Sequence, residues 1–197
     1  VLRTLETINT DTAGLAAATG RGALLLRLPA KPRTIAGRAL LLHLAENTPE
    51  TLLLDAMNPD GGWGAAPGKA SDPLDTVIAV EALLARENEP DGGWTATADY
   101  LTDAQALTGL WQFSDAAGPG TLELTARTVR ALLALRDSGV AHAGLAAAIN
   151  RGVQVLRSSQ RLDGSFVLGA VGGVAASPRI TAEVYRTLIR VDPPGLY

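Results

Sequence analysis

The chain carries the stretch Asn58-Pro59-Asp60-Gly61-Gly62-Trp63, and two later stretches have nearly the same pattern. These are Asn88-Glu89-Pro90-Asp91-Gly92-Gly93-Trp94 and Gln160-Arg161-Leu162-Asp163-Gly164-Ser165-Phe166. In each stretch an aspartate precedes small residues and an aromatic ring, and a helical Ala- and Leu-rich segment follows. A turn and a helix that recur along one chain predict a repeat architecture.

Each part of the pattern has a physical role in a turn. An aspartate accepts hydrogen bonds from nearby backbone N–H groups, glycine adopts positive φ, and an aromatic ring can cover a helix end. We therefore interpret one set of residues as structural parts of repeat turns: Asp60, Trp63, Asp91, Trp94, Gln160, Asp163 and Phe166.

Helical periodicity accounts for most of the chain, and no segment shows the sustained alternation that marks a strand. The predicted helices cover residues 34–46, 49–57, 75–86, 100–113, 121–137, 141–159 and 178–191, with one or two more expected within 1–28. The sequence thus predicts a single all-α domain over residues 1–197. Its repeats lie in 34–191, and residues 1–33 form a helical extension or an incomplete repeat.

Threonines mark a shared register in these helices. Thr76, Thr125 and Thr181 each precede a leucine by seven residues. Seven residues are two helical turns, so each leucine lies on the same face as its threonine. Small residues share these helices and would let their axes approach closely, as an inner ring of helices requires.

The composition excludes several classes of function. The net charge is −3 and the Lys and Arg residues do not cluster, which argues against nucleic-acid binding. The absence of cysteine excludes thiolate chemistry and cysteine-containing zinc sites. No apolar run reaches the ~18–20 residues of a membrane span. We expect no metal site and no cofactor.

The repeat resembles that of the squalene cyclase and protein prenyltransferase superfamily, in which a Gln stands three residues before the aspartate. Gln160 keeps this position, whereas Met57 and Asn88 replace it in the other two stretches. In that superfamily helical hairpins form an α/α toroid, whose inner helices line a central cavity. The resemblance covers residues 34–191 and implies an irregular or incomplete α/α toroid.

The resemblance also implies where catalytic groups would lie. Cyclases of this type use an Asp-x-Asp-Asp-Thr motif whose middle aspartate protonates the isoprenoid. This chain has Asp72-Pro73-Leu74-Asp75-Thr76, with Leu74 at the place of the proton donor. Leucine cannot act as a general acid. Asp72 and Asp75 are thus weak catalytic candidates, and a helix cap is the competing interpretation.

Other residues could line a cavity. Trp111, Phe113 and Tyr185 lie in predicted helices rather than in repeat turns, and Asp103 and Glu183 lie at comparable points of those helices. All five are possible cavity residues, with core packing as the alternative for the rings.

The preferred functional hypothesis is a non-catalytic toroid module that binds or scaffolds, within a larger bacterial secreted or cell-surface protein. Its partner would be another protein or the remainder of a larger chain, and an apolar small molecule is a possible ligand. One alternative is a terpene-cyclase-like enzyme with an altered acid site. Another is half of a larger toroid, which predicts an exposed apolar stripe on the terminal helices.

Overall fold

The computed structural model describes residues 32–44, 48–113, 120–167 and 176–191. They form seven α-helices: α3 (Ile35–Leu44), α4 (Thr51–Leu54), α5 (Pro73–Leu84), α6 (Thr95–Asp103), α7 (Leu122–Asp137), α8 (Leu145–Ser158) and α9 (Pro178–Val191). Within these ranges extended backbone pairs only at an isolated bridge between Val167 and Ala176. The predicted all-α fold is confirmed, and the helices expected within 1–28 lie outside the described residues.

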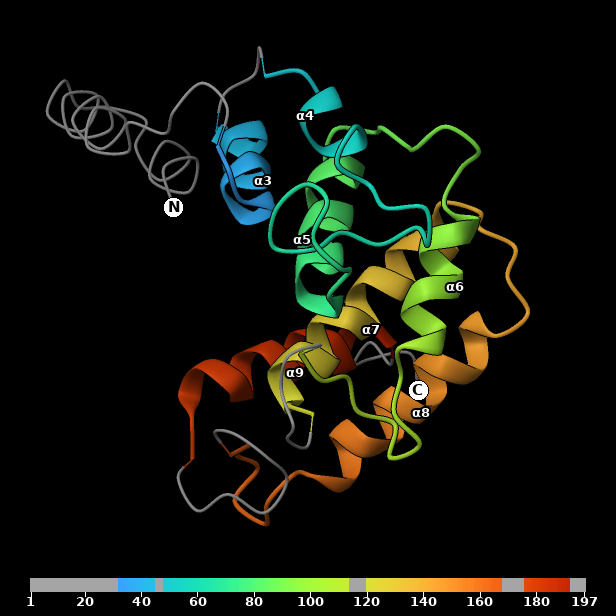
Figure 1. Cartoon of the computed structure of the whole chain (residues 1–197). Coiled ribbons are helices and arrows are strands. Elements are labelled where there is room, and N and C mark those ends of the chain that lie inside the picture. Colours follow the sequence, from blue (N-terminus) through green and yellow to red (C-terminus); the bar gives the residue numbers. More distant parts are fainter. Residues whose placement is uncertain (1–31, 45–47, 114–119, 168–175, 192–197) are drawn as a thin grey trace, which may run out of the picture.

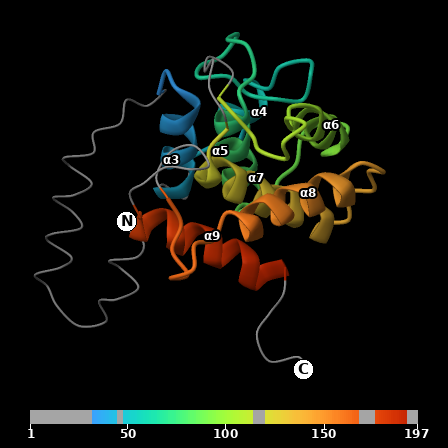
Figure 2. The ribbon, with the colours of Figure 1, turned by 90° about the horizontal axis from the view of Figure 1, so that it is seen from below.

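The helices form a curved double row (Figure 1). We call α3, α5, α7 and α9 the inner helices, because each contacts the next in a continuous row. The outer helices α4, α6 and α8 lie on the convex side of this row, and the view from below in Figure 2 shows the same arrangement. Each outer helix leads through a turn into the following inner helix. This alternation is that of an α/α toroid, of which the described residues form an arc. None of the described helices has the length and apolar character needed to cross a membrane.

Three turns connect the outer helices to the inner helices and share one backbone pattern. We call residues 57–63, 105–111 and 160–166 the first, second and third repeat turns. In each turn a glycine has a positive φ, at Gly61 (82°), Gly109 (83°) and Gly164 (81°). The N–H of that glycine donates to the carbonyl three residues earlier in all three turns. Glycine is needed here because L-residues with a side chain rarely adopt this backbone conformation.

The aromatic residue that ends each turn is fixed by a threonine of the next inner helix. The backbone N–H groups of Trp63, Trp111 and Phe166 donate to threonine Oγ1 atoms at 2.9, 3.1 and 3.0 Å. The acceptors are Thr76, Thr125 and Thr181, the threonines that share a register in the sequence.

The tryptophan rings also bind the preceding outer helix. Trp63 Nε1–H donates to the Leu53 carbonyl at 2.8 Å, and Trp111 Nε1–H donates to the Leu101 carbonyl at 2.7 Å. All three terminal rings of the repeat turns are fully buried. Each of the two tryptophans therefore joins the end of an outer helix to the start of an inner helix.

The interpretation of residues 88–94 as a repeat turn is wrong. Trp94 is buried, but it precedes α6 at its N-terminus, and Asp91 is exposed in the loop before it. The second repeat turn is 105–111, where Thr108 stands at the position of Asp60 and Asp163. For the same reason the predicted helix 100–113 is wrong: α6 covers Thr95–Asp103, and the chain then enters the turn.

The buried threonine hydroxyls should contribute measurably to stability. Thr125 is fully buried and accepts from the Trp111 N–H. Thr125→Val keeps the shape but removes the acceptor, so we expect the free energy of unfolding to fall by about 1–3 kcal/mol in urea denaturation. The matched control Thr108→Val changes an exposed threonine of the same turn and should stay within about 0.5 kcal/mol of the parent. Equal losses in both variants would contradict this role of the hydroxyl.

Candidate ligand site on the concave face

The inner helices direct regularly spaced side chains to the concave side of the arc. On α5 these are Leu74, Ile78 and Glu81, whose spacing of four and three residues places them on one helix face. We call Thr76, Thr125 and Thr181, whose hydroxyls accept from the three repeat turns, the turn threonines. Counted from the turn threonine, the same positions hold Glu123, Arg127 and Arg130 on α7, and Arg179, Glu183 and Arg186 on α9. The concave face therefore changes from mostly apolar on α5, where Glu81 is the one charged residue of the three, to charged on α7 and α9.

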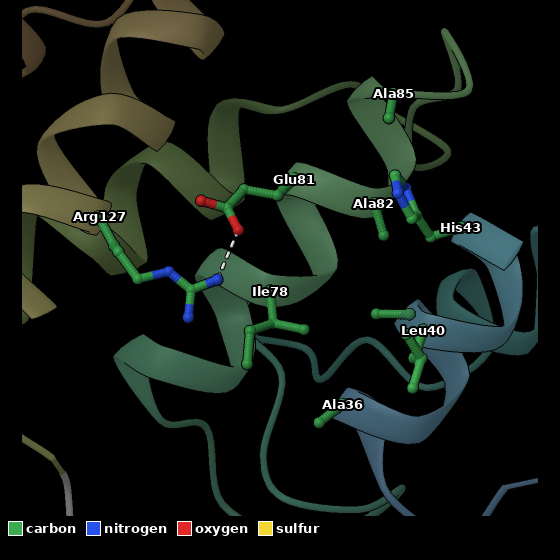
Figure 3. Close-up of a pocket in the computed structure, with 9 residues that line it drawn as sticks. Ala36, Leu40, His43, Ile78, Glu81, Ala82, Ala85 and Arg127 are labelled. Carbon is green, nitrogen blue, oxygen red and sulfur yellow. Dashed lines mark hydrogen bonds and ion pairs between the residues drawn. The ribbon is translucent and has the colours of Figure 1, made fainter. Parts of the chain in front are cut away.

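A hollow of about 420 Å³ opens between α3, α5 and α7 (Figure 3). Its wall is mostly apolar, and polar groups stand at its edge. The apolar lining residues are Ala36, Ala39, Leu40, Ile78, Ala82 and Ala85, and the polar ones are His43, Glu81 and Arg127. Four alanines leave this space open, because larger side chains would fill it.

Ion pairs hold the charged part of the concave face. Arg127 Nη2 donates to Glu81 Oε2 at 2.6 Å, as Figure 3 shows at the edge of the hollow. Arg130 lies 2.8 Å from Glu183 Oε2 on α9 and also donates to the Thr187 hydroxyl at 3.2 Å. These half-buried pairs connect α5, α7 and α9, and they fix the polar side of the hollow.

A second cleft, of about 540 Å³, lies at the start of α5 and contains both aspartate candidates. Asp72 caps the helix, since its carboxylate accepts from the Leu74 N–H at 2.8 Å. Asp75 lies in the first turn. Burial raises the pKa of the Asp75 carboxyl, and the nearby negative charge of Asp72 raises it further. Leu74 and Phe113 line the same cleft.

The five residues considered for a cavity lie in different places. Phe113 lines the Asp75 cleft, and Glu183 faces the concave side in its pair with Arg130. Trp111 is fully buried as the ring of the second repeat turn, and Asp103 is exposed at the end of the outer helix α6. Tyr185 is partly exposed on α9, where its ring meets Phe166 edge-on at 5.9 Å.

The hollow itself was not found by sequence reasoning. Leu40, Ile78 and Arg127 line it, but their residue types alone do not indicate that they line a cavity. A usable signal exists in the register, because Ile78 and Arg127 each stand two residues after a turn threonine. Among the described residues, no group of three or more His, Asp or Glu side chains is placed to hold a metal ion.

Comparison with known proteins gives a sequence relative and two structural neighbours. No family model matches the sequence. Over 71 residues the chain is 41% identical to drimenyl diphosphate synthase from Streptantibioticus cattleyicolor, a match that covers 36% of this chain and 13% of the relative. The structure is similar to the type II terpene cyclase MstE from Scytonema, with a TM-score of 0.61 and 19% identity. It is also similar to Candida albicans protein geranylgeranyltransferase-I, with a TM-score of 0.61 and 14% identity.

The chain therefore has the α/α-toroid fold of terpene cyclases and protein prenyltransferases, as the repeat predicted. The cyclase match covers 81% of this chain and 56% of the cyclase, and the transferase match covers 80% and 49%. The chain thus spans about half the length of these solved structures and a small part of the curated relative.

The two aspartates Asp75 and Asp137 should affect stability with opposite dependence on pH. Because the pKa of Asp75 is raised in the folded protein, ionisation of this carboxyl lowers the free energy of unfolding. This destabilisation is absent at low pH, where Asp75 is protonated, and grows as pH rises. Asp75→Asn removes this destabilisation. We expect the free energy of unfolding of Asp75→Asn, relative to the parent, to increase between about pH 3 and pH 6.

Asp137→Asn is the control of opposite sign. Hydrogen bonds from Arg190 and Arg136 lower the pKa of Asp137, so its ionised form favours folding. That contribution is lost as pH falls, and Asp137→Asn should become more destabilising as pH rises. Urea titrations over this pH range measure both. If the free energies of unfolding of the two variants, relative to the parent, changed with pH in the same direction, the opposite pKa shifts of Asp75 and Asp137 would be contradicted.

Proposed function

We propose that the concave face forms one wall of a binding site for an isoprenoid chain in a terpene-cyclase-like toroid. The observation that carries this proposal is the apolar hollow between α3, α5 and α7. A branched hydrocarbon chain binds through burial of apolar surface, about 25 cal/mol per Å². The alanines and Ile78 offer such a surface on the side of the arc that a closed toroid would enclose.

The comparisons support this ligand class. The sequence relative is a drimenyl diphosphate synthase, and one structural neighbour is a type II terpene cyclase. The other neighbour is described as a complex with GGPP. Because the chain spans about half of these structures, we assign it a binding wall rather than a complete active site.

A non-catalytic binding module is the second candidate, and the position of Leu74 favours it. The resemblance gives this position, two residues before the turn threonine, to the proton donor. The equivalent positions on α7 and α9 hold Glu123 and Arg179, which bind each other at 2.5 and 2.7 Å. Glu123 is thus engaged by a guanidinium, and Leu74 has no proton to give. The secreted or cell-surface location stays a prediction.

Binding and turnover of geranylgeranyl diphosphate test these two candidates together. We expect saturable binding in calorimetry, and we expect Ile78→Asp to weaken it by about tenfold or more, since it places a charge in the apolar hollow. The matched control is Leu162→Asp, which adds the same charge at a fully exposed leucine of the third repeat turn.

Mass spectrometry of extracts from the same incubations separates the cyclase from the module. Binding without cyclised product supports the module. Product that Asp75→Asn abolishes would assign the acid role to Asp75 and overturn the module. Absence of saturable binding, or equal affinity in Ile78→Asp and the parent, would contradict the isoprenoid wall itself.

A further inference from the structure

Two of the three repeat turns are covered by the outer helix that follows them. Thr97 of α6 donates its hydroxyl to the Gly61 carbonyl of the first turn at 2.8 Å. On the second turn, Gln105 Nε2 donates to the Ala148 carbonyl of α8 at 3.0 Å, and Arg151 Nε donates to Gln105 Oε1 at 2.9 Å. A hydrogen-bonded contact between a turn and the next outer helix therefore occurs twice, with different donors and acceptors.

The outer helices approach the turns so closely that there is no room for a side chain at Gly61 or Gly109. A Cβ atom on Gly61 would lie 2.5 Å from the Ala96 carbonyl oxygen of α6. A Cβ atom on Gly109 would lie 3.0 Å from the Arg151 carbonyl oxygen of α8. Glycine at these two positions thus serves the helix that covers the turn as well as the turn itself.

The third repeat turn has the same backbone but no covering helix among the described residues. A Cβ atom on Gly164 would meet only the Tyr185 hydroxyl at 3.2 Å and the Gln160 amide at 3.8 Å. Gln160, the equivalent of Gln105, donates to this hydroxyl at 2.6 Å rather than to a helix carbonyl. Among the residues that the structure describes, none occupies the surface that α6 and α8 occupy on the earlier turns.

The inner helix next to this turn is open on the matching side. Register from the turn threonine makes Tyr185 and Ile189 of α9 the equivalents of Val129 and Leu133 of α7. Val129 and Leu133 are 0% and 1% exposed, whereas Tyr185 and Ile189 are 38% and 50% exposed. Val129 is buried against α8, since a Cβ atom on Gly152 would lie 2.6 Å from its Cγ2. Together with Ala182, these two α9 residues form an apolar stripe at a spacing of three and four residues.

We propose that the third repeat turn and this α9 stripe form a docking surface for one further helical hairpin of the same repeat type. Its outer helix covers Gly164 and Gln160, as α8 covers the second turn. The same outer helix packs on Tyr185 and Ile189, as α8 packs on Val129 of α7. The inner helix of the hairpin lies beside α9, as α9 lies beside α7. The surface thus continues an interface that the arc already contains twice.

The length of the fold indicates the same occupant. The chain spans 56% and 49% of the toroids that it matches, so further hairpins are needed to reach their length. A second copy of this arc fits less well. In the described part of the chain no outer helix precedes α3, so the described part of a second copy would offer an inner helix to α9 but no outer helix to the third turn.

A peptide of residues 138–191 of this chain is the probe, because it carries the hairpin that follows α7. Fluorescently labelled peptide is titrated into the full chain and followed by sedimentation velocity. We expect a saturable one-to-one complex. Tyr185→Asp and Ile189→Asp in the full chain should each weaken it by about tenfold or more, since a charge would be buried on the stripe.

Leu107→Asp is the matched control, because Leu107 is a fully exposed leucine on the second repeat turn, away from the stripe. It should bind the peptide like the parent, and circular dichroism checks that all variants are folded. Ile78→Asp should also bind the peptide normally, so failure of the isoprenoid proposal and failure of the docking proposal are distinguishable.

Three results would overturn the docking surface as assigned. One is the absence of peptide binding. Another is equal binding to the parent and to Tyr185→Asp, which would indicate exchange with the chain's own hairpin. The third is a dimer of the full chain alone that Ile189→Asp converts to a monomer, which would assign the surface to self-association.

Discussion

The arc depends on one hydrogen bond that recurs at each repeat turn, from the backbone N–H of the turn's last aromatic residue to the hydroxyl of a threonine in the next inner helix. This bond fixes the start of an inner helix to the end of the turn before it. Trp63 and Thr76 form the first such pair, and Trp111 and Thr125 form the second. Because both partners are fully buried, the bond cannot be exchanged for one with water. Each inner helix therefore begins at the same place relative to its turn, and the helices stand side by side with a constant direction of curvature.

The first and third repeat turns could be predicted from sequence because their residue types match their backbone. Asp60 and Asp163 each accept from the N–H two residues later, and a glycine with positive φ follows each aspartate. The second turn could not be predicted from the same types. Thr108 replaces the aspartate there. The stretch Asp91-Gly92-Gly93-Trp94 has the residue types of a repeat turn, but it lies before the outer helix α6. The better signal was the buried threonine, since a hydroxyl inside a helix interface needs a partner.

The candidate site was harder to predict than the fold. Asp72 and Asp75 stand out by charge, and the structure places both in one cleft. The hollow between α3, α5 and α7 exists instead because several of its lining side chains are small alanines. Alanines are common in any helix, and only the position of the neighbouring helices decides whether an alanine fills a core or leaves a space. The sequence alone therefore does not show that Ala82 lines a hollow rather than fills a core.

The third repeat turn differs from the others in its ring. Phe166 has no indole N–H, so the bond that Trp63 and Trp111 send back to the preceding outer helix has no counterpart there. Leu156, ten residues before Phe166, occupies the position of the acceptors Leu53 and Leu101. The third repeat turn thus lacks the hydrogen bond that joins each of the other two turns to the outer helix before it. Local opening costs less where fewer bonds hold an element, so the third repeat turn should separate from the end of α8 more readily than the first two turns separate from α4 and α6.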